Sequence, residues 1–314
     1  MDRASGILMP VFSLPGKFGI GTLGKEAKNF VDFLKRAEQK YWQVLPLGPS
    51  GCGNSPYSSY STFAGNPYLI DFDILIKEKF LSEDDVKSID WGTGDVDYNK
   101  INANKLNVLR KAYRKFLGME KGRLDEFVSK NHWVYDYALY MALKERFNMK
   151  PWTEWDTDIK MRKSETLEYY RNLLKYEIDF HIFVQYLFFW QWTDLKEYAN
   201  GRGVKIIGDL PIYVAMDSVD VWASPESFLL DENNFPTEVA GVPPDYFSKT
   251  GQLWGNPIYD WEAMKDDGYG WWIRRLDGAN RMFDVIRIDH FRGLASYWAV
   301  PSGEKTPING EGKK

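Results

Sequence analysis

Four short apolar runs, separated by stretches with helical periodicity, constrain the fold of this chain more than any other feature. The last run begins at Phe283 and is too short and too rich in β-branched residues for a helix, so we expect a buried strand of a parallel sheet. The predicted strands cover residues 6–13, 41–47, 205–214 and 283–290. Repeated β-α units of this kind predict either a (β/α)8 barrel or a doubly wound sheet.

The segments between these strands are predominantly helical in pattern. An amphipathic helix with Thr22 as its candidate N-cap joins the first two strands into a β-α-β unit. A second helical stretch, 164–199, leads into the third strand. Residues 76–163 have helical patterns without a buried strand, and 214–279 carry loops and a Trp-rich helix. We interpret both as insertions in the parallel fold.

The fourth predicted strand ends in an Arg-x-Asp triplet. The period of two places Val285, Arg287 and Asp289 on one face, opposite an isoleucine face that can pack on helices. A guanidinium beside a carboxylate favours its ionised form, which a nucleophile or an electrostatic stabiliser requires. A structural ion pair at a strand end is the alternative interpretation, and the triplet alone does not decide between them.

The stretch 287–292 resembles the nucleophile strand of the 4-α-glucanotransferases, the amylomaltase or disproportionating-enzyme family related to the α-amylases. Further segments carry the same resemblance, in the order found in the family: 16–24, 55–57, 63–68, 208–214, 241–247 and 251–257. The resemblance implies a (β/α)8 TIM barrel of the α-amylase type. Residues 1–314 would supply a part of this catalytic barrel, with only its first four strands and the two insertions.

The resemblance also implies an activity and roles for residues. Segments of α-1,4-glucans would be transferred between maltooligosaccharides by a retaining mechanism, with Asp289 as the nucleophile and Arg287 holding it ionised. Tyr57 would stack on the sugar, with Ser55 as a weaker candidate beside it. Asp209 would accept a sugar hydroxyl. From the residues alone, a turn aromatic is the leading interpretation of Tyr57, and Asp209 could equally be an Asx-turn residue that closes its strand.

The segment 242–257 combines glycine and proline with aromatic side chains, which predicts an active-site loop. The resemblance assigns Tyr246, Phe247 and Trp254 in this loop as apolar platforms for the glucan. An Ω-loop packed on itself is the alternative.

The resemblance has one gap. The family's acid/base glutamate and its third carboxylate follow the nucleophile strand, and neither motif occurs in this sequence. We therefore expect 1–314 to be the N-terminal portion of such an enzyme and to be inactive or incomplete by itself. An α-glucan hydrolase and a non-catalytic glucan-binding fragment remain as alternative functions.

Composition excludes several other classes of protein. A net charge of −4 without long charged runs disfavours a nucleic-acid partner. No apolar stretch has the length of a membrane span, and the single Cys52 fits a reducing compartment, so a cytoplasmic protein is expected. With three histidines and no close acidic cluster, the sequence predicts no metal site, and it indicates no cofactor.

Overall fold

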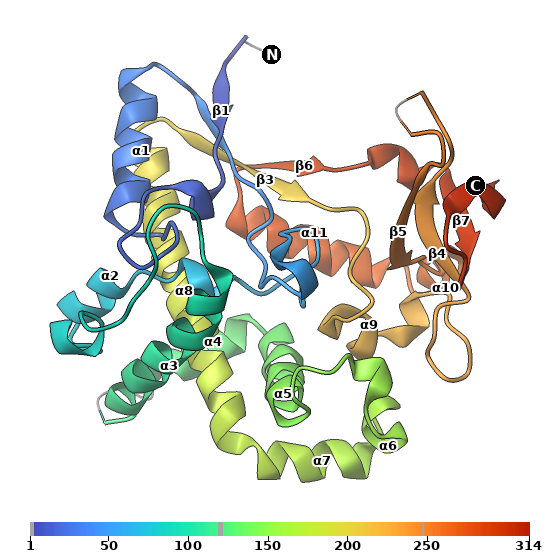
Figure 1. Cartoon of the computed structure of the whole chain (residues 1–314), viewed down its shortest axis with the longest axis horizontal. Helices are drawn as coiled ribbons and strands as arrows, with labels where there is room; N and C mark the ends of the chain where they lie inside the picture. The colour runs from blue at the N-terminus through green and yellow to red at the C-terminus, as the bar shows by residue number, and fades with distance from the viewer. Residues whose placement is uncertain (1–2, 119–121, 247) are drawn as a thin grey trace.

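The computed structural model describes residues 3–118, 122–246 and 248–314 and contains a parallel four-stranded sheet. The strand order is β1-β2-β3-β6, and every neighbouring pair is parallel. These strands are β1 (Gly6–Leu8), β2 (Tyr41–Gln43), β3 (Lys205–Leu210) and β6 (Val285–Ile288). The predicted parallel α/β sheet is therefore confirmed (Figure 1).

All four strands are shorter than predicted. The range 6–13 is wrong beyond Leu8, because Pro10 has no N–H to donate and the chain turns into a short 3-10 helix, Val11–Ser13. Pro211 ends β3 in the same way. Single ladder bonds continue past two other strands: the Val44 N–H donates to the Ile207 carbonyl at 3.0 Å, and the Asp289 N–H to the Leu210 carbonyl at 2.9 Å.

Helices from separate parts of the chain pack on the sheet. Helix α1 (Lys25–Arg36) contacts β2, α8 (Lys175–Gly201) contacts β3, and α11 (Gly270–Met282) contacts both β3 and β6 (Figure 1). The predicted helix 164–199 is two helices, since the chain breaks at Leu174 between α7 (Ser164–Leu173) and α8. Each connection returns the chain to a parallel neighbour, so the carboxyl ends of β3 and β6 lie at one edge of the sheet.

The predicted N-cap at Thr22 is wrong. Gly24 occupies the N-cap position of α1 and makes no side-chain cap. The Thr22 hydroxyl instead donates to Asp71 Oδ2 at 2.6 Å, and Asp71 caps α2 (Phe72–Lys77) by accepting from the Ile74 N–H. This hydrogen bond therefore links the segment just before α1 to the segment that precedes α2.

A group of helices lies below the sheet in Figure 1 and surrounds α8. The described residues of 76–163 contain helices and turns but no strand. Helix α8 is buried on most of its circumference, because other helices pack around it as well as the sheet. The longer helices of this region are α3 (Tyr98–Phe116), α4 (Gly122–Lys130) and α5 (Trp133–Arg146), followed by the short α6 (Thr157–Lys160).

A second, antiparallel sheet stands beside the carboxyl edge of the parallel one, near the C-terminus in Figure 1. Its order is β5-β4-β7-β8. The segment 242–257, predicted as a single loop, is largely a β-hairpin, because β4 and β5 pair across its turn. Strand β5 is mostly exposed, so it lacks the apolar run that would reveal a strand. The strands are β4 (Glu238–Val242), β5 (Gln252–Pro257), β7 (Tyr297–Pro301) and β8 (Glu311–Lys313).

Short helices α9 (Val219–Ala223) and α10 (Trp261–Asp266) complete the region 214–279 between β3 and β6. Within the part of the chain that the structure describes, no helix has both the length and the apolar character needed to cross a membrane.

Candidate active site

Two parallel strands bring Asp209 and Arg287 together. The register of β3 and β6 places these residues directly opposite each other, near the carboxyl ends of their strands. Arg287 Nη1 lies 2.5 Å from Asp209 Oδ1, and Nη2 lies 2.6 Å from Asp289 Oδ1. The guanidinium therefore bridges two carboxylates with two charge-assisted hydrogen bonds. The predicted proximity of Arg287 and Asp289 is present, with Asp209 as a third member.

Tyr57 joins this arrangement from the loop after β2. Its hydroxyl donates to Asp209 Oδ2 at 2.7 Å. Ser55 supports the loop, since its Oγ accepts from the Tyr57 N–H at 3.3 Å. Three segments far apart in the sequence thus form what we call the site network, consisting of Tyr57, Asp209, Arg287 and Asp289.

Exposure differs sharply along the site network. The Asp209 side chain is fully buried, whereas those of Arg287 and Asp289 are 45% and 41% exposed. Each Asp209 oxygen accepts a hydrogen bond from a protein group, so in this geometry Asp209 orients Arg287 and Tyr57. Its acceptance of a sugar hydroxyl stays a prediction. Asp289 is the carboxylate of the network that an incoming ligand can reach.

Charge and burial alter the titration of two members of the site network. Removal from water, followed by the hydrogen bond to Asp209, raises the pKa of Tyr57 to about 12. The hydrogen bond to Asp209 is the largest cause that raises the pKa of Arg287 above its ordinary value. Near neutral pH the network therefore contains a protonated phenol and a permanent guanidinium cation.

Trp254 of the antiparallel sheet reaches the chain that follows β6. Its ring meets the His290 ring edge-on, with the centroids 4.9 Å apart, and also contacts Tyr213 at 6.2 Å. His290 has a left-handed backbone, with φ of 51°, so the chain turns sharply directly after Asp289. Partial burial is the main cause that lowers the pKa of His290. The structure thus places Trp254 beside the residue that follows Asp289.

The other two predicted platforms are Tyr246 and Phe247. Tyr246 lies in the hairpin turn and is 97% exposed. Phe247 lies outside the described residues. The roles of both as glucan platforms stay predictions.

Two cavities lie near this edge of the sheet. A recess of about 60 Å³, lined by Tyr57, Asp209 and Tyr213 among others, adjoins the site network. It is far smaller than the roughly 300 Å³ at which ligand pockets begin, so the exposed surface at Asp289 is the more suitable place for a sugar. A larger cavity of about 1110 Å³ lies between helices α4, α5, α8 and α11.

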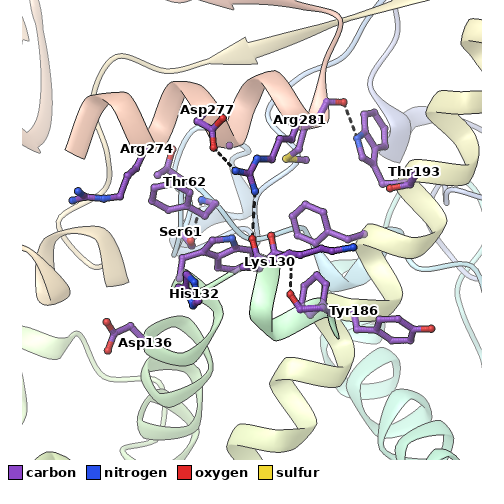
Figure 2. A pocket seen from close by; sticks show the side chains of 18 of the residues that line it. Ser61, Thr62, Lys130, His132, Asp136, Tyr186, Thr193, Arg274, Asp277 and Arg281 are labelled. Atoms are coloured by element: carbon purple, nitrogen blue, oxygen red, sulfur yellow. Dashed lines mark hydrogen bonds and ion pairs between the residues drawn. The ribbon is translucent and has the colours of Figure 1, made fainter. Parts of the chain in front are cut away.

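The larger cavity has no member of the site network in its lining. Figure 2 shows Arg281 of α11 in this cavity, where it pairs with Asp277 at 2.6 Å and donates to the Lys130 carbonyl of α4 at 3.3 Å. Ser61, Thr62, Asp220 and Met282 line both cavities. These four residues therefore form the wall between the recess at the site network and the larger cavity.

Within the described residues, no three His, Cys, Asp or Glu side chains are grouped so that they could hold a metal ion. The acidic members of the site network bond to a guanidinium and a phenol.

A sequence profile of the 4-alpha-glucanotransferase family matches residues 9–314. The chain belongs to this family. It is 49% identical over 307 residues to a 4-alpha-glucanotransferase of Clostridium butyricum, which covers 96% of this chain and 63% of that protein. It is 47% identical over 317 residues to the 4-alpha-glucanotransferase of Thermus thermophilus, which covers 99% of this chain and 62% of that protein. The chain thus spans 62–63% of the length of these two relatives.

Solved structures of amylomaltases share this fold. The amylomaltase of Streptococcus agalactiae, in complex with acarbose, has a TM-score of 0.97 at 47% identity, over 99% of this chain and 64% of that chain. The amylomaltase of Corynebacterium glutamicum has a TM-score of 0.81 at 19% identity, over 99% of this chain and 44% of that chain, which shows the common fold.

In this member of the 4-alpha-glucanotransferase family, the sequence alone does not predict the contact between Asp209 and Arg287. A sequence signal exists, because both residues stand near the carboxyl ends of strands of one parallel sheet. Only the β3–β6 register shows that they are opposite each other. The contact of Trp254 with His290 has no such signal, since it depends on how the hairpin docks.

Proposed function

We propose that the protein transfers α-1,4-glucan segments between maltooligosaccharides by a retaining double displacement. The observation that carries this proposal is the double ion pair of Arg287, which fixes the exposed Asp289 against the buried Asp209. Membership in the 4-alpha-glucanotransferase family supports the reaction class. The S. agalactiae relative, at 47% identity, binds acarbose.

In the first step, Asp289 would attack the anomeric carbon of the donor. Oδ1 of Asp289 bonds to Arg287, and among the described residues Oδ2 has no hydrogen-bond partner, so Oδ2 is available for attack. A bond forms between Oδ2 and the anomeric carbon while the glycosidic C–O bond breaks, and a general acid gives its proton to the leaving oxygen. None of residues 1–314 is assigned as this acid.

In the second step, the 4-hydroxyl of an acceptor glucan would attack the same carbon. Its proton passes to the conjugate base of the general acid, and the bond to Asp289 breaks, which restores the carboxylate. Water in place of the acceptor would give hydrolysis. Acceptor subsites that bind sugar and exclude water would therefore decide the outcome.

Aromatic side chains would hold the sugars on either side of the broken bond. Tyr57 is 40% exposed, and its hydroxyl is hydrogen-bonded to Asp209. The hydrogen bond fixes the orientation of the ring, and the exposed part of the ring is open for stacking on a sugar. Trp254 is 36% exposed and is held by His290 and Tyr213. We assign Tyr57 to the sugar at the cleaved bond and Trp254 to a sugar farther along the chain.

We further propose that the parallel sheet is the first half of a (β/α)8 barrel, with 76–163 and 214–279 as insertions. The strand order β1-β2-β3-β6, with a helix before each later strand, is that of consecutive barrel units. The site network then lies at the carboxyl ends of the strands, where barrel enzymes carry their chemistry.

The test uses the full-length protein, with maltotriose as the sole sugar and chromatography of the products. Transfer gives glucose together with chains longer than maltotriose, whereas hydrolysis gives only shorter products. Asp289→Asn should abolish both products while maltooligosaccharide binding persists, because an amide cannot act as the nucleophile. Products no longer than maltotriose would favour a hydrolase, and binding without turnover by the wild type would favour a glucan-binding protein.

A further inference from the structure

A buried arginine on α11 stands behind the site network. Arg275 is only 2% exposed, and its guanidinium donates in three directions. Nε donates to Thr62 Oγ1 at 2.8 Å, Nη1 to the Ile212 carbonyl at 2.8 Å, and Nη2 to the Pro211 carbonyl. Such a fork is specific to arginine, because its planar group presents several donors in fixed directions.

The two segments that Arg275 joins are the segments that carry Tyr57 and Asp209. Thr62 belongs to the loop of Tyr57, and Pro211 follows β3, which carries Asp209. The hydrogen bond between Tyr57 and Asp209 spans the same two segments at the surface. Arg275 therefore makes a second, buried connection beneath that hydrogen bond.

Neighbouring groups hold both ends of this connection. Asp220 Oδ2 accepts from the Thr62 N–H at 2.8 Å. Tyr259 donates its hydroxyl to the Ile212 carbonyl at 2.7 Å and accepts from Arg275 Nη1 at 3.0 Å. Thr62 thus bonds through both its backbone and its side chain, and the chain after β3 is fixed independently of the site network.

The chemistry of these partners makes Arg275 difficult to replace. Its hydrogen-bond acceptors are two carbonyls and two hydroxyls, all of them neutral. Burial of a cation is costly unless its donors are satisfied, so a weaker donor set at this position would leave polar groups without partners. The adjacent Arg274 is exposed on the same helix, which provides a matched control.

We propose that Arg275 is a positioning residue for the transfer reaction, and this inference rests on the function proposed above. Its fork sets the spacing between the loop of Tyr57 and the end of β3. That spacing lets the Tyr57 hydroxyl reach Asp209, which in turn holds Arg287 against Asp289. Arg275 itself is buried behind these residues and touches no substrate.

The test compares Arg275→Lys with Arg274→Lys in the full-length protein, with kcat and KM measured on maltotriose. Lysine keeps the charge but cannot donate to all of these acceptors at once, so kcat/KM should fall by roughly tenfold or more while the circular dichroism spectrum is retained. Arg274→Lys should leave both constants within about twofold of wild type. Unchanged kinetics for Arg275→Lys would overturn the proposal.

A double-mutant cycle separates positioning from general packing. In a Tyr57→Ala background, Arg275→Lys should cost only about twofold, because the side chain that Arg275 positions is already absent. Losses that simply multiply would show that Arg275 acts on packing alone, and would overturn the proposal.

If Arg275→Lys does not fold, Thr62→Val removes only the acceptor of Nε and keeps the side-chain shape. Its kcat/KM should fall by several-fold, and Thr62→Ser, which retains the hydroxyl, should restore it. Equal rates for Val and Ser would contradict the role.

A structural readout keeps this inference distinct from the proposed function. A crystal structure of Arg275→Lys, or of Thr62→Val where the lysine variant does not fold, should show the Tyr57 hydroxyl beyond hydrogen-bond distance of Asp209. An unchanged contact would refute positioning even in an active enzyme. Absence of transfer by the wild type would refute the proposed function, while the displacement of Tyr57 would still support the positioning role.

Discussion

Asp209 and Arg287 lie opposite each other on β3 and β6, and their charged groups are 2.5 Å apart although 78 positions separate them in the sequence. Because Asp209 is buried and Arg287 is half-exposed, the contact anchors a surface guanidinium to the interior of the fold. The same guanidinium holds Asp289 at 2.6 Å. The position of the candidate nucleophile therefore depends on a residue of the neighbouring strand.

Asp209→Asn tests this dependence. The amide can still accept a hydrogen bond from Tyr57, but it removes the charge that pairs with Arg287. Loss of one charge-assisted hydrogen bond predicts a fall in kcat/KM of roughly 10- to 100-fold. Steady-state kinetics on maltotriose would measure it. A change of less than twofold would show that Arg287 orients Asp289 without help from β3.

Arg287→Lys should impair transfer at least as strongly. An ammonium is a point charge on a flexible stem and cannot bridge the two carboxylates with the geometry of a planar fork. We expect kcat to fall by roughly 100-fold, with Arg281→Lys, an exposed arginine on α11, as the control that retains wild-type rates. An unaltered kcat in Arg287→Lys would reduce Arg287 to a packing residue.

Trp254→Ala should weaken the use of long glucans more than that of short ones. The ring packs on His290 and does not belong to the site network, so we assign it to sugars beyond the cleaved bond, which only longer donors supply. We expect kcat/KM to fall by roughly tenfold for maltoheptaose, as for the loss of a stacked aromatic, and by less than twofold for maltotriose. Equal losses for both donors would assign Trp254 to packing.

The buried Lys105 should make the stability of the fold depend on pH, and this effect is separate from catalysis. Its ammonium is fully buried in α3, donates to the Tyr68 carbonyl at 2.7 Å and lies 4.6 Å from the centre of the Phe72 ring. Burial lowers the pKa of Lys105 to about 7. Between pH 7 and the ordinary lysine pKa of 10.5, the unfolded chain therefore holds a proton that the folded chain lacks.

This difference makes the wild type more stable as the pH rises from about 7 towards 10.5, by up to about 1.4 kcal/mol per pH unit. Below pH 7, lysine is charged in both states and the full cost of burial remains. In Lys105→Met, this increase of the free energy of unfolding with pH should be absent. Lys35→Met, on the exposed side of α1, should show the same increase as the wild type. Urea unfolding across this range measures it, and parallel slopes for wild type and Lys105→Met would contradict the prediction.

The parallel sheet could be predicted from the sequence because each β-α unit has its own local pattern. The same applies to Arg287 and Asp289, whose common face follows from a period of two. The predicted ranges 6–13 and 205–214 run through Pro10 and Pro211, which have no N–H for the ladder, so the ends of these two strands are wrong.

Other features depend on contacts between distant segments. The strands of the antiparallel sheet are short, and β5 is largely exposed, so the hairpin at 242–257 has no apolar alternation to reveal it. Thr22 is of a residue type that suits an N-cap, but its hydroxyl donates a hydrogen bond to Asp71, 49 residues away. The network around Asp209 likewise depends on the register between strands, which no local pattern contains.

The nucleophilic role of Asp289 can be tested most directly by trapping the glycosyl-enzyme. An activated fluoroglucosyl fluoride needs little help from a general acid, and its fluorine slows the second step, so the covalent intermediate should accumulate. Peptide mass spectrometry of the labelled full-length protein should find one sugar on Asp289, and none in Asp289→Asn. A sugar on a different carboxylate, or complete turnover through an unlabelled Asp289, would contradict the proposed mechanism.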